Sequence, residues 1–106
     1  MLKGKTAIVT GSTSGIGLGI ATALAAKGCD VMLNGFGDPA AIEKLRADLA
    51  ERHGVGVAYF AADMAKPAEI RRLVSETARR FGTVDILVNN AGIGRASCRE
   101  RVSYHV

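Results

Sequence analysis

The sequence contains no tryptophan, and its aromatic residues are limited to two tyrosines and three phenylalanines among 106 residues. So few aromatic side chains argue against a nucleic-acid surface on which bases would stack. The only two cysteines, Cys29 and Cys98, cannot form the disulfide framework of a small secreted domain, which favours a reducing compartment. Glycine, in contrast, occurs 13 times and indicates several tight backbone turns.

Hydropathy and charge exclude further classes of protein. Apolar residues make up 48% and charged residues 23% of the chain, which is typical of a folded domain. Serine, threonine and glycine interrupt the uncharged stretch 6–26, so we expect neither a signal peptide nor a membrane-spanning helix, and we expect a cytoplasmic protein. Residues 93–106, with three arginines and one glutamate, supply half of the net charge of +4. The other 92 residues therefore carry a net charge of only +2, which is too little for a basic binding surface. We expect neither nucleic acid nor a membrane as a partner.

Four short apolar runs, at 6–10, 31–33, 57–61 and 86–88, alternate with three segments of helical periodicity. The runs lack the polar alternation of a half-exposed strand, which is typical of a parallel sheet covered on both faces. The fold class predicted is therefore α/β, a doubly wound parallel sheet with a strand first and last. A small α+β domain with antiparallel strands is the alternative, but no tight turn joins two strands.

Three helices are predicted between the apolar runs, each with an apolar stripe. The stripes are Ile16, Ile20 and Leu24; Ile42, Leu45 and Leu49; and Ile70, Leu73, Val74, Thr77 and Phe81. A basic residue in the last turn and a following glycine are predicted to end each helix, with the glycines at Gly28, Gly54 and Gly82. Pro39 and Pro67 are predicted to mark where the second and third helices begin.

A glycine-rich string follows the first predicted strand and opens the first predicted helix. It reads Thr10-Gly11-Ser12-Thr13-Ser14-Gly15-Ile16-Gly17. Glycine lets a backbone approach a pyrophosphate closely, and the first amides of a helix favour an anion, so we expect the amide hydrogens of this string to form a cradle for a dinucleotide diphosphate. The spacing G-x-x-x-G-x-G is neither the common dinucleotide fingerprint nor a P-loop, and an ordinary glycine-rich turn is the alternative.

This string resembles the cofactor loop of the short-chain dehydrogenase/reductase family. A second string after the fourth predicted strand resembles the N-N-A-G motif of that family, and it reads Asn89-Asn90-Ala91-Gly92. The resemblance covers residues 1–92 and implies that they are the N-terminal half of a Rossmann-type NAD(P)-binding domain with strand order 3-2-1-4. Residues 93–102 instead resemble a translated sequencing adapter, so we expect 93–106 to be a non-native tail; a divergent native loop is the alternative.

Within the family, residues 11–21 together with 33–38 resemble bacterial D-3-hydroxybutyrate dehydrogenases. This implies hydride transfer between NAD and (R)-3-hydroxybutanoate or acetoacetate, by a full-length homotetramer. The family's catalytic serine, tyrosine and lysine follow the N-N-A-G motif, whereas Tyr104 is followed by only two residues, so we expect this chain to be an inactive fragment without catalytic residues or a metal site. The alternatives are a fragment of another short-chain reductase, such as a 3-oxoacyl-carrier-protein reductase, and a non-catalytic nucleotide-binding module.

The choice between NAD and NADP depends on the end of the second strand, which reads Asn34, Gly35 and Phe36. No cation there pairs with a 2′-phosphate, so NAD is favoured over NADP, although the carboxylate common in NAD sites is also absent. The resemblance implies that Phe36 covers the adenine, with plain packing as the alternative, and that Asp63 accepts a hydrogen bond from the adenine amino group, with helix capping as the alternative. It also implies a backbone contact from Met64. Asn89 is expected to tie its strand to neighbouring strands.

The resemblance implies that the cofactor is bound by the glycine-rich string and by residues that follow the later predicted strands. They are Gly11, Ser12, Thr13, Ser14, Gly15, Ile16, Gly17, Phe36, Asp63, Met64, Asn90, Ala91 and Gly92.

Overall fold

A computed structural model of the protein describes residues 2–90, and the alternation of strands and helices expected from the sequence is confirmed. The elements are β1 (Thr6–Val9), α1 (Gly15–Ala26), β2 (Asp30–Leu33), α2 (Pro39–His53), β3 (Val57–Tyr59), α3 (Pro67–Phe81) and β4 (Ile86–Val88). The first and third strands end earlier than their apolar runs. Among the described helices, none is both long enough and apolar enough to cross a lipid bilayer.

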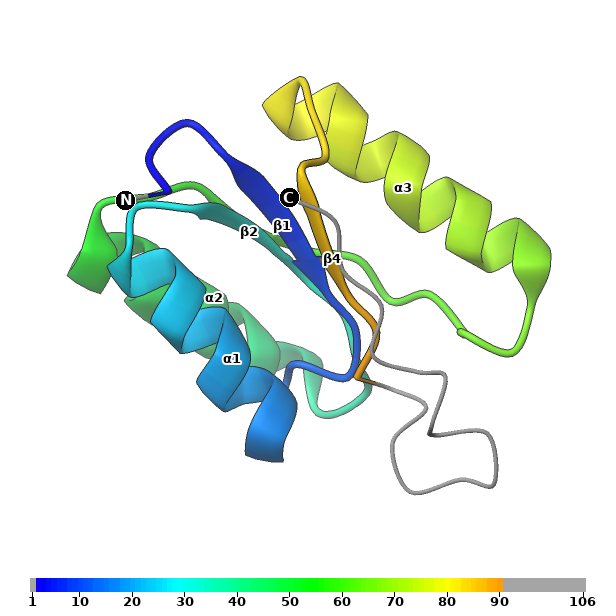
Figure 1. The fold of residues 1–106 in the computed structure, drawn as a ribbon. Coiled ribbons are helices and arrows are strands. Elements are labelled where there is room, and N and C mark those ends of the chain that lie inside the picture. The colour runs from blue at the N-terminus through cyan, green and yellow to red at the C-terminus, as the bar shows by residue number, and fades with distance from the viewer. Residues whose placement is uncertain (1, 91–106) are drawn as a thin grey trace.

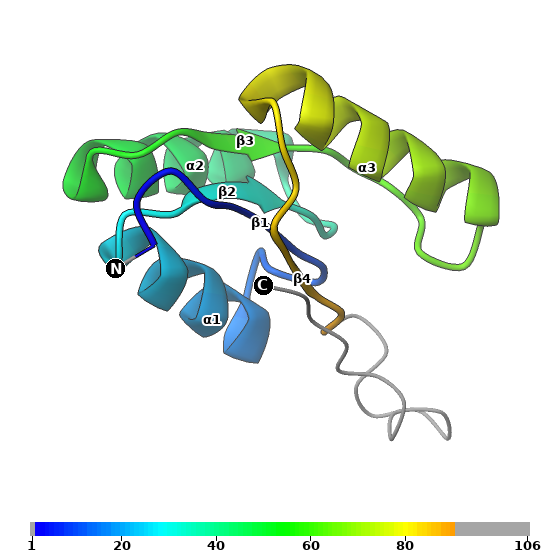
Figure 2. The ribbon, with the colours of Figure 1, turned by 45° about the horizontal axis from the view of Figure 1, so that its top comes forward.

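The four strands form one sheet in the order β3-β2-β1-β4, and every neighbouring pair is parallel. Helices α1 and α2 cover one face of the sheet and α3 covers the other, as Figure 1 shows. Figure 2 gives a second view of the same separation of α1 from α3 by the strands. The fold is thus an α/β Rossmann-like arrangement with the strand order that the resemblance implies, and the antiparallel alternative is wrong.

Alternate residues of each strand pack on opposite faces of the sheet, which is why the strands are apolar except at their ends, where Thr6, Asp30 and Tyr59 lie. Val9, Val31 and Leu33 pack with Ala21 of α1 and Leu49 of α2. On the other face, a second cluster packs against α3, and its buried members are Ile8, Met32, Ala58, Ala62 and Leu73. Both faces of the sheet are therefore withdrawn from water, and polar side chains collect where the strands end.

The buried face of α1 differs from the predicted stripe. The helix buries Gly17, Ala21 and Ala25, whereas Ile16 is 67% exposed. Ile20 and Leu24 are half-buried at the side of the same cluster. The stripe prediction is wrong for Ile16 because small residues let a helix lie closer to a sheet than large ones, and periodicity of large apolar residues does not reveal that choice.

The second and third helices follow their predicted stripes more closely. Ile42 and Leu49 of α2 and Leu73 and Thr77 of α3 are buried, but Val74 is 39% exposed, so its inclusion in the stripe is wrong. Both helices begin at the predicted prolines and end at Gly54 and Gly82, whose φ angles of +66° and +87° favour glycine. In α1 the expected basic residue, Lys27, is the C-cap itself and lies outside the last turn.

Cys29 lies immediately before β2 and is fully buried, as expected of a small apolar side chain. Burial raises the pKa of its thiol to about 11, with the nearby carboxylates of Asp30 and Asp85 acting in the same direction. The thiolate is therefore suppressed at neutral pH, and the residue serves packing.

The close contact of α1 with the loop after β1 gives a stability prediction. A Cβ at Gly17 would overlap the carbonyl oxygen of Gly11 and lie 2.6 Å from Nδ2 of Asn90, whereas a Cβ at the exposed Gly19 meets nothing within 4 Å. We expect Gly17→Ala to lower the free energy of unfolding by about 1–3 kcal/mol. Gly19→Ala, the matched control on the same helix, is expected to raise it by about 0.5–1 kcal/mol. Urea unfolding measures both, and equal effects would contradict the packing described.

Candidate functional site

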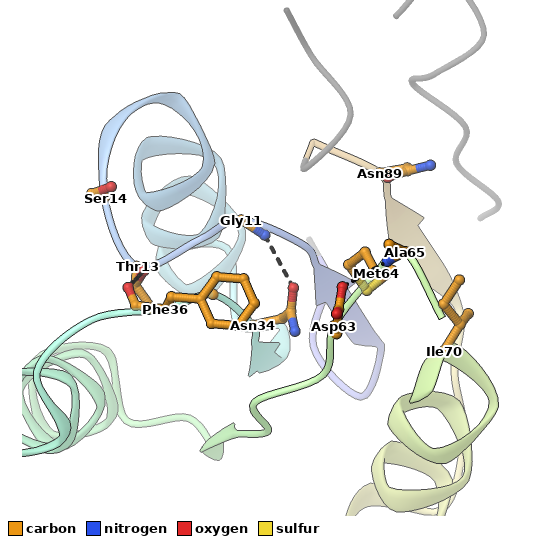
Figure 3. A pocket seen from close by; sticks show the side chains of 11 residues that line it. Gly11, Thr13, Ser14, Asn34, Phe36, Asp63, Met64, Ala65, Ile70 and Asn89 are labelled. Atoms are coloured by element: carbon orange, nitrogen blue, oxygen red, sulfur yellow. Dashed lines mark hydrogen bonds between the residues drawn. The ribbon is translucent and has the colours of Figure 1, made fainter. Parts of the chain in front are cut away.

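The carboxyl ends of all four strands border one cleft of about 600 Å³. The residues that line it come from the segments that follow β1, β2, β3 and β4 and from the first turn of α3. They are Gly11, Thr13, Ser14, Asn34, Gly35, Phe36, Asp63, Met64, Ala65, Ile70 and Asn89 (Figure 3). Ligands of open α/β sheets bind at this edge, where the strand order reverses.

The loop after β1 brings the glycine-rich string to the cleft. Gly11 and Gly15 have φ angles of +60° and +61°, a backbone conformation that favours glycine. Ser14 is the N-cap of α1, its side chain makes no capping hydrogen bond, and the first turn of the helix contains no acidic residue. Because Ser14 lines the cleft, the N-terminal end of α1, which is the positive end of the helix dipole, lies beside it and suits an anion.

Not all amides of the string face the cleft. The Gly11 N–H donates to Oδ1 of Asn34 at 3.3 Å, and the Ser12 N–H donates to the Asn34 carbonyl oxygen at 2.6 Å. The expectation of a cradle made by the whole string is wrong for these two amides, because they satisfy a buried neighbour. Among residues 2–90, no acceptor is recorded for the Thr13 or Ser14 amide.

The remaining predicted loop residues do not line the cleft. Ser12 is fully buried, with its hydroxyl bonded to Asn34. Gly17 is buried beneath the loop, and Gly15 and Ile16 are exposed beside it. They shape the loop and the start of α1, whereas Gly11, Thr13 and Ser14 present the surface of the cleft.

At the end of β2, Gly35 and Phe36 border the cleft in a conformation held by two hydrogen bonds. The Tyr59 hydroxyl donates to the Gly35 carbonyl oxygen, and the Thr13 hydroxyl donates to the Phe36 carbonyl oxygen at 3.1 Å. A Cβ at Gly35 would lie 2.5 Å from Oγ1 of Thr13, so no side chain fits there. Phe36 is 73% exposed, which excludes plain core packing as its role.

Asp63 and Met64 line the cleft from the segment after β3. Oδ1 of Asp63 accepts a hydrogen bond from the Ala65 N–H at 2.9 Å, which stabilises the turn before α3. The N-cap of α3 is Lys66, so the alternative in which Asp63 caps that helix is wrong. Among the described residues that line the cleft, Asp63 carries the only charged side chain, and none is a lysine or arginine.

The two asparagines after β4 have different surroundings. Asn89 lines the cleft, and its Oδ1 accepts a hydrogen bond from the Thr10 hydroxyl at 3.3 Å, so it ties β4 to β1 as expected. The Asn90 N–H donates to the Thr10 hydroxyl at 2.8 Å, and Nδ2 of Asn90 donates to the Gly11 carbonyl oxygen at 3.1 Å. Asn90 thus holds the loop after β1. Ala91 and Gly92 lie outside the described residues.

Comparison with known proteins decides the family. Residues 5–104 match the family model described as short chain dehydrogenase. The chain belongs to the short-chain dehydrogenase family. This is a family of oxidoreductases that bind a nicotinamide cofactor and act on small molecules.

Several curated relatives from this family resemble the chain. It is 54% identical to a D-beta-hydroxybutyrate dehydrogenase of Cupriavidus necator, over 94% of this chain and 38% of the relative. A protein of the same name from Rhizobium meliloti is 51% identical over 84% of this chain and 34% of the relative. A 3-oxoacyl-[acyl-carrier-protein] reductase of Chlamydia muridarum is 37% identical over 97% of this chain and 41% of the relative. The chain therefore spans well under half the length of these short-chain dehydrogenase relatives.

A solved structure of the family has the same fold. The L-sorbose reductase of Gluconobacter frateurii, in complex with NADPH and L-sorbose, superposes with a TM-score of 0.80 at 39% identity. The match covers 89% of this chain and 35% of the reductase.

Five residues that line the cleft of this short-chain dehydrogenase are absent from the site predicted from the sequence. They are Asn34, Gly35, Ala65, Ile70 and Asn89. In the sequence, Asn34 and Gly35 belong to the string 33–38 that carries the resemblance, and they are interpreted there as uncharged positions at the end of the second strand. The available signal is a polar amide directly after the apolar run 31–33, because a buried amide requires hydrogen-bond partners. Among the described residues, no group of three or more histidine, cysteine or acidic side chains is placed to hold a metal ion.

Proposed function

We propose that this chain is the cofactor-binding part of an NAD-dependent dehydrogenase that interconverts (R)-3-hydroxybutanoate and acetoacetate. The observation that carries the proposal is one cleft that joins a glycine-rich loop and a helix N-terminus to the exposed ring of Phe36 and the carboxylate of Asp63. The substrate rests on the two D-beta-hydroxybutyrate dehydrogenases at 54% and 51% identity. Residues 1–92 would form the N-terminal half of the Rossmann domain of a longer, homotetrameric protein.

The residues of the cleft favour one orientation of a bound dinucleotide, with its diphosphate at the glycine-rich loop and its adenine at Phe36 and Asp63. The amides from Thr13 onward and the start of α1 would face the diphosphate, with Gly11 allowing close approach of the backbone. The ring of Phe36 would cover the adenine, and Asp63 would accept a hydrogen bond from the adenine amino group while Met64 contributes a backbone contact. The segment 90–92 would lie beside the ribose.

The chemistry divides between this chain and the rest of the proposed longer protein. When bound, the nicotinamide would supply the acceptor for the hydride that leaves the carbinol carbon of the substrate. The residues of this chain bind and orient the dinucleotide, and orientation of two reactants lowers the barrier to such a transfer. The groups that receive the hydroxyl proton and stabilise the developing oxyanion would lie beyond residue 92, as they do in the family's pattern.

The charge of the cleft supports NAD rather than NADP. A 2′-phosphate is a dianion that needs a cationic or multiple hydrogen-bonding partner. Within residues 2–90, the residues that line the cleft include no cation, and their one charge is the negative carboxylate of Asp63. The Thr13 side chain also leaves no room for a side chain at Gly35. The solved L-sorbose reductase has the same fold and is in complex with NADPH. The preference for NAD proposed here therefore follows from the residues of this cleft and not from the fold.

We expect the protein to bind NAD at least about tenfold more tightly than NADP, because the extra phosphate meets no cation among the described residues that line the cleft. Isothermal titration of both dinucleotides at one ionic strength measures the difference. Phe36→Arg adds a cation at an exposed position beside Gly35 and is expected to reduce the difference between the affinities for NAD and NADP. Equal affinities of the unmodified protein for NAD and NADP would contradict the proposed preference.

We expect Phe36→Ala to weaken NAD binding by a factor of about 3–10, because stacking between aromatic rings is lost. The melting temperature is expected to stay unchanged, since the side chain is 73% exposed. Val74→Ala is the matched control, because Val74 is also an exposed apolar residue but lies outside the cleft. An equal effect of the two substitutions on NAD affinity would remove adenine stacking from the proposal.

The substrate is tested on the longer protein that the proposal requires. Its coding sequence is expected to contain, downstream of the N-N-A-G motif, a serine followed by a tyrosine and a lysine four positions later. The purified protein is expected to reduce NAD with (R)-3-hydroxybutanoate and not with the (S) enantiomer, as followed by NADH absorbance.

A second candidate function is a reductase of 3-oxoacyl thioesters. It is supported by the 37% identity to the Chlamydia muridarum reductase, a match that covers 97% of this chain. Faster oxidation of NADPH with an acetoacetyl thioester than with acetoacetate would favour it. NAD binding by a protein whose gene lacks the downstream serine, tyrosine and lysine would instead favour a non-catalytic nucleotide-binding module.

A further inference from the structure

Asn34 is the first residue after β2, and its side chain joins three strand ends. The residue is 1% exposed. Its Nδ2 donates to the carbonyl oxygens of Phe60 and Ala62, both at 3.1 Å, and its Oδ1 accepts from the Gly11 N–H at 3.3 Å. Both hydrogens of the amide and its oxygen therefore have partners, which come from the segments after β1 and β3.

The backbone of Asn34 is bonded to the same loop. Its N–H donates to the Ser12 hydroxyl at 3.0 Å, and its carbonyl oxygen accepts from the Ser12 N–H at 2.6 Å and from the Ser12 hydroxyl at 3.3 Å. Ser12 and Asn34 are both buried. The loop after β1 and the end of β2 are thus locked together by backbone and side-chain hydrogen bonds away from water, where such bonds are difficult to replace.

Only an amide of this length satisfies all three partners. An aspartate at position 34 would have an acceptor for the Gly11 N–H but no hydrogen for the two carbonyl oxygens, and a leucine would satisfy none of the three. Each buried polar group left without a partner is destabilising. The position is therefore determined by hydrogen bonding and not by volume.

We propose that Asn34 is the positioning residue of the nicotinamide-dinucleotide site. It turns the amides of Gly11 and Ser12 into the protein, so that the amides from Thr13 onward are the ones left for the diphosphate. The same residue precedes Gly35 and Phe36, whose carbonyl oxygens are held by Tyr59 and Thr13. The two sides of the cleft are thereby placed relative to each other before any ligand binds, which lowers the ordering cost of binding. This inference rests on the proposed binding of NAD in the cleft.

Amide hydrogen exchange, followed by NMR on the unmodified protein with and without NAD, tests the orientation of the loop. The Gly11 and Ser12 amides are expected to be protected in the free protein and to change little when NAD is added. The Thr13 and Ser14 amides are expected to exchange fast and to become protected by NAD. Equal exchange of all four amides in the free protein, or equal protection of all four by NAD, would overturn the inference.

A pair of substitutions at the two ends of β2 separates positioning from general stability. Asp30 also ties β2 to the segment of β3, since its Oδ1 accepts from the Gly56 N–H at 2.8 Å, but at the end of the sheet opposite the cleft. We expect Asn34→Ala to raise the dissociation constant for NAD by about tenfold or more, and Asp30→Ala to leave it within about twofold, at a temperature where both are folded. Equal dissociation constants for the two variants would overturn the inference.

A further variant covers the case in which Asn34→Ala does not fold. Ser12→Ala removes the hydroxyl that accepts from the Asn34 N–H but keeps the Ser12 amide and the whole side chain of Asn34. It is expected to leave the Gly11 amide protected and to weaken NAD binding by less than about threefold. Loss of Gly11 protection in this variant would show that Asn34 does not hold the loop. Failure of the unmodified protein to bind NAD would refute the proposed function itself, whereas normal binding with an unaffected Asn34→Ala variant refutes only the inference.

Discussion

The burial of both faces of the parallel sheet is the constraint on which the rest of this structure depends. Because α1 and α2 cover one face and α3 the other, the strands have no solvent-facing side on which polar groups could be placed. Side chains with hydrogen-bonding capacity are therefore confined to the segments where strands end. At the carboxyl edge these segments border a single cleft, and its chemistry follows from which residues occupy the four strand ends.

Close approach of backbone segments is the second requirement at that edge. Gly17 allows α1 to contact the loop after β1, and Asn90 bonds to the same loop from β4. Gly35 leaves room for the Thr13 side chain, whose hydroxyl holds Phe36. The glycines at positions 17 and 35 thus act through the space that they leave, and the hydrogen bonds around them keep a loop rich in small residues in one conformation.

Membership of the short-chain dehydrogenase family and the geometry of the cleft are consistent with each other. The family indicates the general chemistry, whereas the cleft bears on the choice of cofactor. The family match and the fold establish membership of a family whose proteins are oxidoreductases that bind a nicotinamide cofactor. The preference between NAD and NADP and the identity of the substrate depend on individual side chains at and beyond the cleft. That is why the proteins similar to this chain include a D-beta-hydroxybutyrate dehydrogenase, a 3-oxoacyl-[acyl-carrier-protein] reductase and an L-sorbose reductase.

The order of strands and helices, the parallel sheet and the glycine-rich loop could be predicted from the sequence alone, because apolar periodicity, proline and glycine act over a few neighbouring residues. The positions of Phe36 and Asp63 beside that loop were implied by the family resemblance, and both residues line the cleft in the structure. Only the tertiary structure decided that α1 buries Gly17, Ala21 and Ala25, that the Gly11 and Ser12 amides face Asn34, and that Asn89 reaches the cleft. These features depend on contacts between residues more than 20 positions apart in the chain. A local sequence pattern cannot predict which buried hydrogen-bond donor pairs with which acceptor.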